Sequence, residues 1–300
     1  MNTTQERKIY DCFMLFNELD LLEIRLKLYY EHVDHFVIVE CNQSFVGKEK
    51  GFCFEENKDR YSQFLDKIIY IKLENELTSA DAWENEATHR NAIMRGLTEA
   101  NDEDTIFIAD LDEFYDIKLL DRNKSFDKIL KIDIPHYNYF LNYKTNSIFD
   151  LTFVSNLKEI KNSDKTLDQI RKSSDFGHIE YDPKNDKSAH MSYVFGNDIE
   201  MYVYKLKSFS HQEFNKKPFI THKHIKHCLK FPTDLFMRKG IWIDCIPPEE
   251  TMFADIYKDY PHLFQTKTDP KPSNISEYIF TFRRNIYKNS KKFSAKKYQF

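Results

Sequence analysis

The chain has 300 residues, of which 41% are hydrophobic and 31% charged, and its formal net charge is -4. This length and apolar content suffice for one large domain or two small ones with a sizeable core. The near-neutral charge without a basic stripe argues against a nucleic-acid-binding protein, and only 6 glycines and 9 prolines exclude a fibrous or low-complexity chain.

Apolar runs and helical patterns alternate along the first third of the chain. The runs at 9–16, 35–41, 68–73 and 105–109 are typical of buried strands. Helical patterns lie between them at 18–32, 55–65 and 80–100, and Asn17 is the expected N-cap of the first. This alternation predicts right-handed βαβ units, and hence an α/β fold with a Rossmann-like, mostly parallel sheet and helices on both faces.

Polar residues follow three of these predicted strands, at 16–18, 40–44 and 110–113. The carboxyl ends of parallel strands meet at one edge of a sheet, and ligands bind beyond that edge. We therefore expect the three polar segments to lie along one rim and to form a site.

The rest of the chain is less regular. An apolar block at 188–196 precedes a helical or strand-like segment at 199–209, which Asp198 would cap if it is a helix. Beyond Glu277 the sequence contains no acid but seven lysines and arginines. We expect one domain over 1–275 and a basic tail over 276–300, which either binds an anionic membrane surface or is a disordered end.

The cysteines and the hydropathy bear on the compartment. The 5 cysteines include no Cys-x-x-Cys pair, and Cys12 and Cys41 lie in apolar runs, which favours buried, reduced thiols. No window approaches the roughly 20 apolar residues that span a bilayer. We expect a soluble, unexported protein, or one that has lost its targeting segment.

Asp110 and Asp112 stand two residues apart, directly after the strand predicted at 105–109. A divalent cation would relieve the repulsion between these carboxylates, and oxygen ligands suit Mg²⁺ or Mn²⁺. Such an ion also binds phosphate oxygens and would neutralise the diphosphate leaving group of a nucleotide-sugar. The alternative is a solvated turn, because Asp-x-Asp alone is a weak motif.

Several segments in the same order make a more specific signal. They are DCFMLFNELDLLEIRLKLYYEHVDHFVIVECNQSFVGKEK, WENEATHRNAIMRGL, IFIADLDEF and AHMSYVFGNDIEMYVYKLKSFSHQEF. Together they resemble glycosyltransferase family 17, the bisecting N-acetylglucosaminyltransferase family. The resemblance is close over 10–116 and moderate over 188–214.

This resemblance implies a GT-A fold, a divalent metal, a UDP-sugar donor (UDP-N-acetylglucosamine in the characterised eukaryotic members) and inversion at the anomeric carbon. It makes 8–116 the nucleotide-sugar-binding half and 117–275 the acceptor-binding half. Asp110 and Asp112 match the family's metal motif, with Leu111 in place of a smaller residue, and Glu113 follows as in the family. The matching donor-site residues are Asn17, Glu18, Glu40, Lys50, Arg90, Asn91 and Asp110.

Some of these residues have structural alternatives. Arg90 would clamp phosphate bidentately, or form a surface ion pair with Glu86. Glu18 would contact the donor, or stabilise the helix dipole as a first-turn acid. Glu40 would bind ribose hydroxyls or uracil.

Inverting transfer also needs a general base for the acceptor hydroxyl. In GT-A enzymes this acid commonly begins a helix after a small-residue loop, which makes Glu200 the first candidate and Asp198 the second; a cap and a solvated acid are the alternatives. His211 is the expected third metal ligand. His190 matches a histidine of the family's Trp-His motif, but Ala189 replaces the tryptophan.

The resulting hypothesis is a metal-dependent glycosyltransferase that moves N-acetylglucosamine to a glycan hydroxyl in the cytoplasm, or at the inner face of a membrane. A sugar nucleotidyltransferase would need a glycine-rich loop where this chain has FNELD. A glycan-binding module without activity predicts loss of the metal ligands. Four aromatic residues are expected either as a buried strand face or as a platform for sugar rings: Tyr137, Tyr139, Tyr143 and Trp242.

Overall fold

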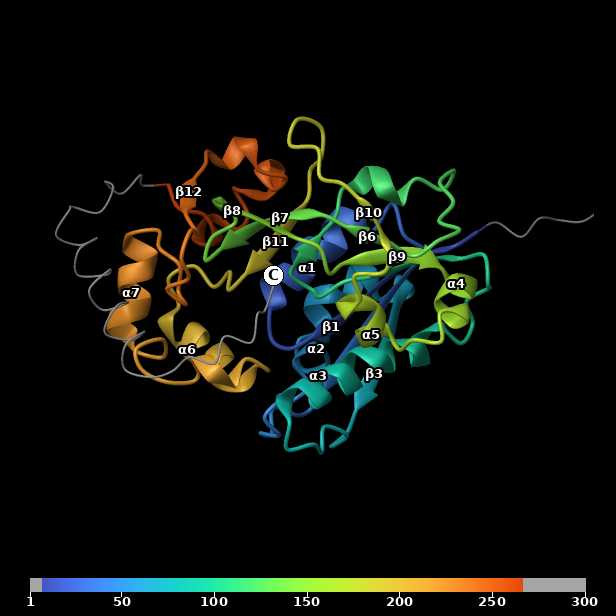
Figure 1. Cartoon of the computed structure of the whole chain (residues 1–300), viewed down its shortest axis with the longest axis horizontal. Helices are drawn as coiled ribbons and strands as arrows, with labels where there is room; N and C mark the ends of the chain where they lie inside the picture. The colour runs from blue at the N-terminus through green and yellow to red at the C-terminus, as the bar shows by residue number, and fades with distance from the viewer. Residues whose placement is uncertain (1–6, 267–300) are drawn as a thin grey trace, which may run out of the picture.

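The computed structural model describes residues 7–266, which contain two β-sheets (Figure 1). The larger sheet has the strand order β10 (Gly177–Ile179), β6 (Leu130–Ile132), β9 (Phe153–Asn156), β4 (Thr105–Ile108), β1 (Ile9–Leu15), β2 (His35–Cys41) and β3 (Ile68–Leu73). The smaller has the order β12 (Ile243–Cys245), β8 (Tyr143–Phe149), β7 (Ile134–Asn138), β11 (Ala189–Ser192) and β5 (Glu113–Phe114).

The predicted parallel core is confirmed. β1 pairs in parallel with β2 and β4, and β2 pairs in parallel with β3, while β9 is antiparallel to β4. The register sets Leu15 beside Glu40 and Cys12 beside Ile108. The carboxyl ends of β1, β2 and β4 therefore share one edge, as the sequence predicts.

Helices cover both faces of this sheet because side chains alternate along its strands. Phe13 and Phe36 pack with helix α1 (Leu19–Tyr29) on one face. Cys12 and Val37 pack on the other face with three helices: η2 (Ala92–Leu97), α4 (Leu157–Asn162) and α5 (Leu167–Lys172). The Rossmann-like α/β fold is thus confirmed.

Three predicted helical patterns differ in detail. Glu18, and not Asn17, occupies the N-cap position of α1, and its side chain makes no capping bond because it is engaged elsewhere. The pattern at 55–65 becomes α2 (Cys53–Glu56) and the 3₁₀ helix η1 (Lys58–Lys67), and that at 80–100 becomes α3 (Ala82–Asn91) followed by η2. η2 approaches β2 so closely that a Cβ on Gly96 would lie 2.4 Å from Val37.

The second half of the chain adds a separate core. Helices α6 (Ile199–Ser208) and α7 (His222–Lys230) pack with Tyr139 and Tyr143, at one end of the smaller sheet (Figure 1). The predicted cap is confirmed, since the Asp198 carboxylate accepts from the N–H groups of the first turn of α6. The predicted aromatic face is buried, since it consists of Tyr137, Tyr139 and Tyr143, whereas Trp242 is 63% exposed.

The remaining elements are short 3₁₀ turns: η3 (Ile117–Leu120), η4 (Gln212–Phe214), η5 (Pro248–Glu250), η6 (Ala254–Ile256) and η7 (Pro261–Leu263). Within residues 7–266, no helix has the length and apolar character needed to cross a membrane. The basic tail predicted at 276–300 lies outside the described residues, and the domain bounds stay a prediction.

Candidate active site

The Asp-x-Asp turn joins β4 of the larger sheet to β5 of the smaller one. Its backbone is fixed from below by Arg25 of α1. The Nη1 group of Arg25 donates to the carbonyl of Glu113 at 2.6 Å and lies 3.3 and 3.4 Å from those of Leu111 and Asp110. The same guanidinium binds Asp11 of β1 in a bidentate, fully buried pair. A buried ion pair therefore sets the shape of the turn.

Asp110 is held by two arginines. Its carboxylate accepts from Arg90 at 3.2 Å and from Arg171 of α5 at 2.8 Å. Burial disfavours the charged form, but the two guanidinium groups outweigh it and keep the pKa of Asp110 well below its usual range. Asp110 is thus a fixed anion.

Glu113 is fully buried and hydrogen-bonded on both oxygens. It forms a bidentate pair with Arg171, and Oε2 also accepts from the Asp110 N–H at 2.9 Å and from the Thr152 hydroxyl. Arg171 thereby bridges Asp110 and Glu113. Burial opposes ionisation of Glu113, yet Arg171 keeps its pKa lowered.

Asp112 differs from both of its neighbours. Among residues 7–266, its carboxylate accepts no hydrogen bond, and its closest charged or imidazole partners are Lys205 at 3.6 Å and His190 at 3.7 Å. Burial and the nearby charges of Asp110, Glu113 and Glu18 raise the pKa of Asp112 to about 7, against the opposing effect of Lys205. Asp112 is the acid of this turn that lacks a strong partner.

Asp112, Glu113 and His190 offer ligand atoms within 4.8 Å of one another, a group able to hold a metal ion. Burial lowers the pKa of His190 to about 4, so its imidazole is neutral near pH 7, as metal binding requires. Within residues 7–266 its Nδ1 atom is buried and has no hydrogen-bond partner, and its ring packs against Phe149 and His136. The Nε2 atom of His190, 3.7 Å from Asp112, also lies 3.1 Å from the Ser192 hydroxyl. Because Arg171 already engages Glu113, Asp112 is the ligand with the weakest partners in the protein.

The charges around this group also suit a cation. Salt bridges join six carboxylates and four cations in two neighbouring groups, each with one carboxylate more than cations, which together leave a formal charge of -2. The carboxylates belong to Glu18, Glu86, Asp110, Asp112, Glu113 and Asp168, and the cations to Arg90, Arg171, Lys172 and Lys205. A divalent ion would balance this excess, so the residues fit Mg²⁺ or Mn²⁺.

A family model describing glycosyltransferase family 17 matches residues 1–282. The chain belongs to glycosyltransferase family 17. This confirms the resemblance found in the sequence and makes the protein a glycosyltransferase. No curated protein was found to match the chain.

Of the residues predicted to bind the nucleotide-sugar donor in this family 17 chain, some lie on the rim of the sheet and others are buried inside the protein. Glu18 lies on the rim, where its carboxylate accepts from Lys205 at 2.9 Å. Asn17 precedes it, and its side-chain oxygen is buried with no hydrogen-bond partner among the described residues. By contrast, Glu40 is fully buried and accepts from Lys50, Tyr70 and the backbone of α2, which leaves it no capacity for a further donor.

Arg90 and Asn91 support the site from within. Arg90 binds Glu86 at 2.7 Å, as the ion-pair alternative expects, but its side chain is only 1% exposed and also contacts Asp110 and Asp168. The Asn91 side chain accepts from the Asp168 N–H. This geometry favours a positioning role over direct phosphate binding.

The predicted third ligand and the predicted bases lie outside the Asp112 group. His211 packs against Trp83 and lies 2.7 Å from Glu213. Glu200 is 75% exposed with His222 at 3.1 Å, and Asp198 caps α6. These assignments stay predictions.

Three residues that the sequence did not predict contact the Asp-x-Asp network: Arg171, Asp168 and Lys205. Lys205 lies in a segment that resembles the family, so the sequence could have identified it. Arg171 and Asp168 lie in an irregular stretch, and no motif marks them.

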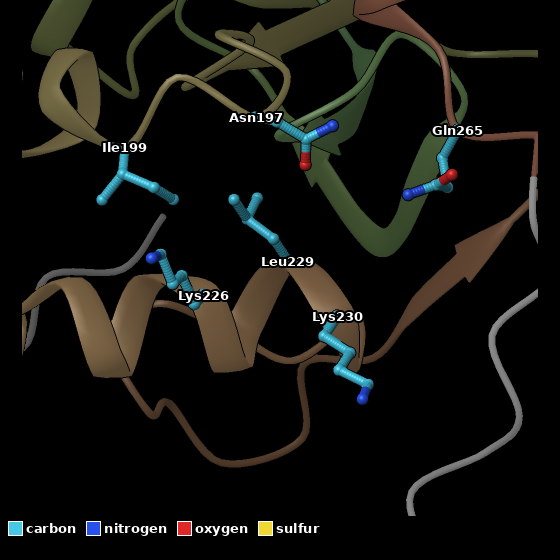
Figure 2. A pocket seen from close by; sticks show the side chains of 6 residues that line it. All are labelled: Asn197, Ile199, Lys226, Leu229, Lys230 and Gln265. Atoms are coloured by element: carbon cyan, nitrogen blue, oxygen red, sulfur yellow. The ribbon is translucent and has the colours of Figure 1, made fainter.

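A pocket of about 320 Å³ lies at the first turn of α6, between this turn and α7 (Figure 2). It is lined by Asn197, Ile199, Lys226, Leu229, Lys230 and Gln265. Lys205 lies six positions after Ile199 on α6, or about 9 Å along the helix. The pocket is therefore adjacent to the predicted bases rather than to Asp112.

Proposed function

We propose that this glycosyltransferase moves N-acetylglucosamine from UDP-N-acetylglucosamine to a glycan hydroxyl, with inversion and with a bound Mn²⁺ or Mg²⁺, on a GT-A fold. The observation that carries the proposal is the Asp112 carboxylate. It lies beyond the ends of parallel strands and accepts no hydrogen bond from residues 7–266, and the surrounding ion pairs leave a formal charge of -2.

Asp112 and His190 would hold the ion, with Glu113 beside them and Asp110 facing the donor. When bound, the ion supplies a Lewis acid that neutralises charge on the diphosphate leaving group. His211 remains a further proposed ligand. The chain's own contribution is rigidity: Arg25 fixes the turn, and Arg171 fixes Asp110 relative to Glu113.

The donor would bind along the rim formed by Asn17 and Glu18. Lys50 and Glu40 would support this rim from inside, because their salt bridge of 2.8 Å is almost entirely buried. Arg90 and Asn91 would act in the same way, through Asp110 and Asp168.

The base in this proposal is Glu200, with Asp198 as the second candidate. Glu200→Gln should abolish transfer, because an amide cannot take the acceptor proton, while donor affinity stays nearly unchanged. Radiolabelled sugar transfer and calorimetric donor titration measure the two effects. If the variant keeps most of its turnover, Glu200 is not the base.

The deciding experiment screens UDP- and GDP-sugars for thermal stabilisation and hydrolysis, with Mn²⁺, with Mg²⁺ and with EDTA. UDP-N-acetylglucosamine should give the largest shift, and EDTA should remove it. Asp102→Asn, at an exposed acid paired with Lys161, is the matched control for Asp112→Asn. Stabilisation by no donor would contradict the proposal and favour a glycan-binding module.

We also propose a cytoplasmic location with membrane contact through the basic tail. Full-length protein and protein truncated at Ser276 are compared by co-sedimentation with anionic liposomes. Stronger binding of the full chain is expected. Equal binding would remove the membrane contact.

A further inference from the structure

Lys205 of α6 joins the two halves of the molecule at the Asp-x-Asp turn. Its ammonium donates to Glu18 at 2.9 Å, at the end of β1, and lies 3.6 Å from Asp112, at the end of β4. It also lies over the rings of Tyr193 and Phe195. Two carboxylates flank this ammonium, which is a cation at neutral pH as lysine ordinarily is.

The cations around the turn differ in what they can still bind. Arg90 and Arg171 are 1% and 4% exposed, and carboxylates occupy their terminal nitrogens. Lys205 is 17% exposed. Its ammonium has three donors, and among the described residues only the contact with Glu18 is a hydrogen bond.

Lys205 is also close to the place where a metal ion would bind. At 3.6 Å, its attraction to Asp112 offsets part of the negative charge there. An ion on Asp112 would repel the ammonium and leave its two unused donors to an anion beside that ion.

We propose that Lys205 binds the terminal phosphate of a nucleoside diphosphate leaving group, as a further catalytic residue. This rests on the proposed function, because it requires a nucleoside diphosphate-sugar donor. Arg90, the cation that the sequence suggested for this contact, would instead position Asp110.

The chemical step assigns Lys205 a charge role only. The bond from the anomeric carbon to the phosphate oxygen breaks, and its electron pair passes to that oxygen. The acceptor oxygen forms the new bond to the anomeric carbon, and its proton passes to the base. Lys205 transfers no proton; it donates hydrogen bonds to the phosphate as negative charge develops there.

Calorimetric titration of the full chain with UDP and UMP, in the presence of Mn²⁺, tests the proposal. In Lys205→Met, UDP affinity should fall about tenfold to hundredfold, as expected for loss of a hydrogen bond between charged groups, and UMP affinity should stay within about twofold. Mn²⁺ affinity should be equal or higher, because a competing cation is gone. Lys207→Met, on the exposed side of the same helix, is the matched control and should match wild type.

The outcomes separate the two proposals. Equal UDP affinity in wild type and Lys205→Met, or a parallel loss of UDP, UMP and Mn²⁺, would overturn the role of Lys205 alone. Wild-type protein that binds neither UDP nor GDP would overturn the proposed function and this role with it.

A second measurement needs no variant. Acetylation of wild-type protein, followed by mass spectrometry, reports the reactivity of each lysine. UDP with Mn²⁺ should protect Lys205 at least about threefold more than UMP with Mn²⁺, with Lys207 unaffected, because only the terminal phosphate covers the ammonium. Equal protection by UDP and UMP would contradict the proposal.

Discussion

Two arginine–carboxylate clusters contact the Asp-x-Asp turn and differ in their net charge. In the first, Arg25 and Asp11 are fully buried and neutral as a pair, and Asp11 also accepts from the Tyr115 hydroxyl at 2.7 Å. In the second, around Asp110 and Asp112, carboxylates outnumber cations. The first cluster has its hydrogen bonds within the protein, whereas in the second the Asp112 carboxylate accepts no hydrogen bond from the part of the chain that the structure describes.

This difference separates stability from function. A neutral ion pair whose hydrogen bonds are all made within the protein stabilises the fold but has no free group for a ligand. An acidic group without a hydrogen-bond partner can bind one. Variants in the first cluster should therefore lower the free energy of unfolding, and variants in the second should lower activity.

The largest effect is expected for Arg25→Met. It leaves Asp11 buried and unpaired, so the free energy of unfolding should fall by about 3–5 kcal/mol. Urea denaturation followed by circular dichroism measures this loss. The double variant Asp11→Asn/Arg25→Met should recover part of it, and a single-variant loss below about 1 kcal/mol would contradict the neutral-pair interpretation.

Asp112→Asn should have the opposite pattern. Transfer should fall by about a hundredfold to a thousandfold, the usual cost of losing one element of electrostatic catalysis, while the melting temperature stays equal or rises. Transfer assays and thermal unfolding measure both. A large loss of stability would show that Asp112 is structural, like Asp11.

A smaller effect is expected for Arg171→Lys. The ammonium keeps the charge but cannot bridge Asp110 and Glu113 as the guanidinium does. Mn²⁺ affinity should fall about tenfold, as for other residues that orient metal ligands. Unchanged affinity in a titration followed by electron paramagnetic resonance would remove Arg171 from the site.

The smallest effect on activity is expected for Glu40→Gln. Its carboxylate accepts from Lys50, Tyr70 and the backbone of α2, and the substitution leaves the nearly buried Lys50 without its counter-charge, so the free energy of unfolding should fall by about 3 kcal/mol with donor affinity unchanged. A selective loss of UDP affinity would instead place Glu40 in direct contact with the donor.

The parts that the sequence predicts are those fixed by local pattern. Apolar runs located β1 to β4 within about a residue, and parallel pairing then put Glu18 and Asp112 on one rim. The Asp-x-Asp motif could be assigned to the site from its position directly after a predicted strand.

The parts that it missed depend on contacts between distant segments. Arg171 reaches Asp110 from 61 positions away, and Lys205 reaches Glu18 from 187 positions away. The hydrogen bonds that saturate the Glu40 carboxylate come from Tyr70, on the neighbouring strand, and from the first turn of α2. Periodicity within one segment contains none of this information.

The Asp112 carbonyl accepts from the Met191 N–H at 2.6 Å, and β5 pairs with β11 through Glu113 and His190. Backbone hydrogen bonds, which do not depend on side-chain identity, thus hold the candidate ligands in position relative to one another. A chimera that takes its acceptor segments from another family member should therefore be joined after Ser192 and not within β11. A junction inside β11 would put the spacing of His190 and Asp112 under the control of a foreign loop.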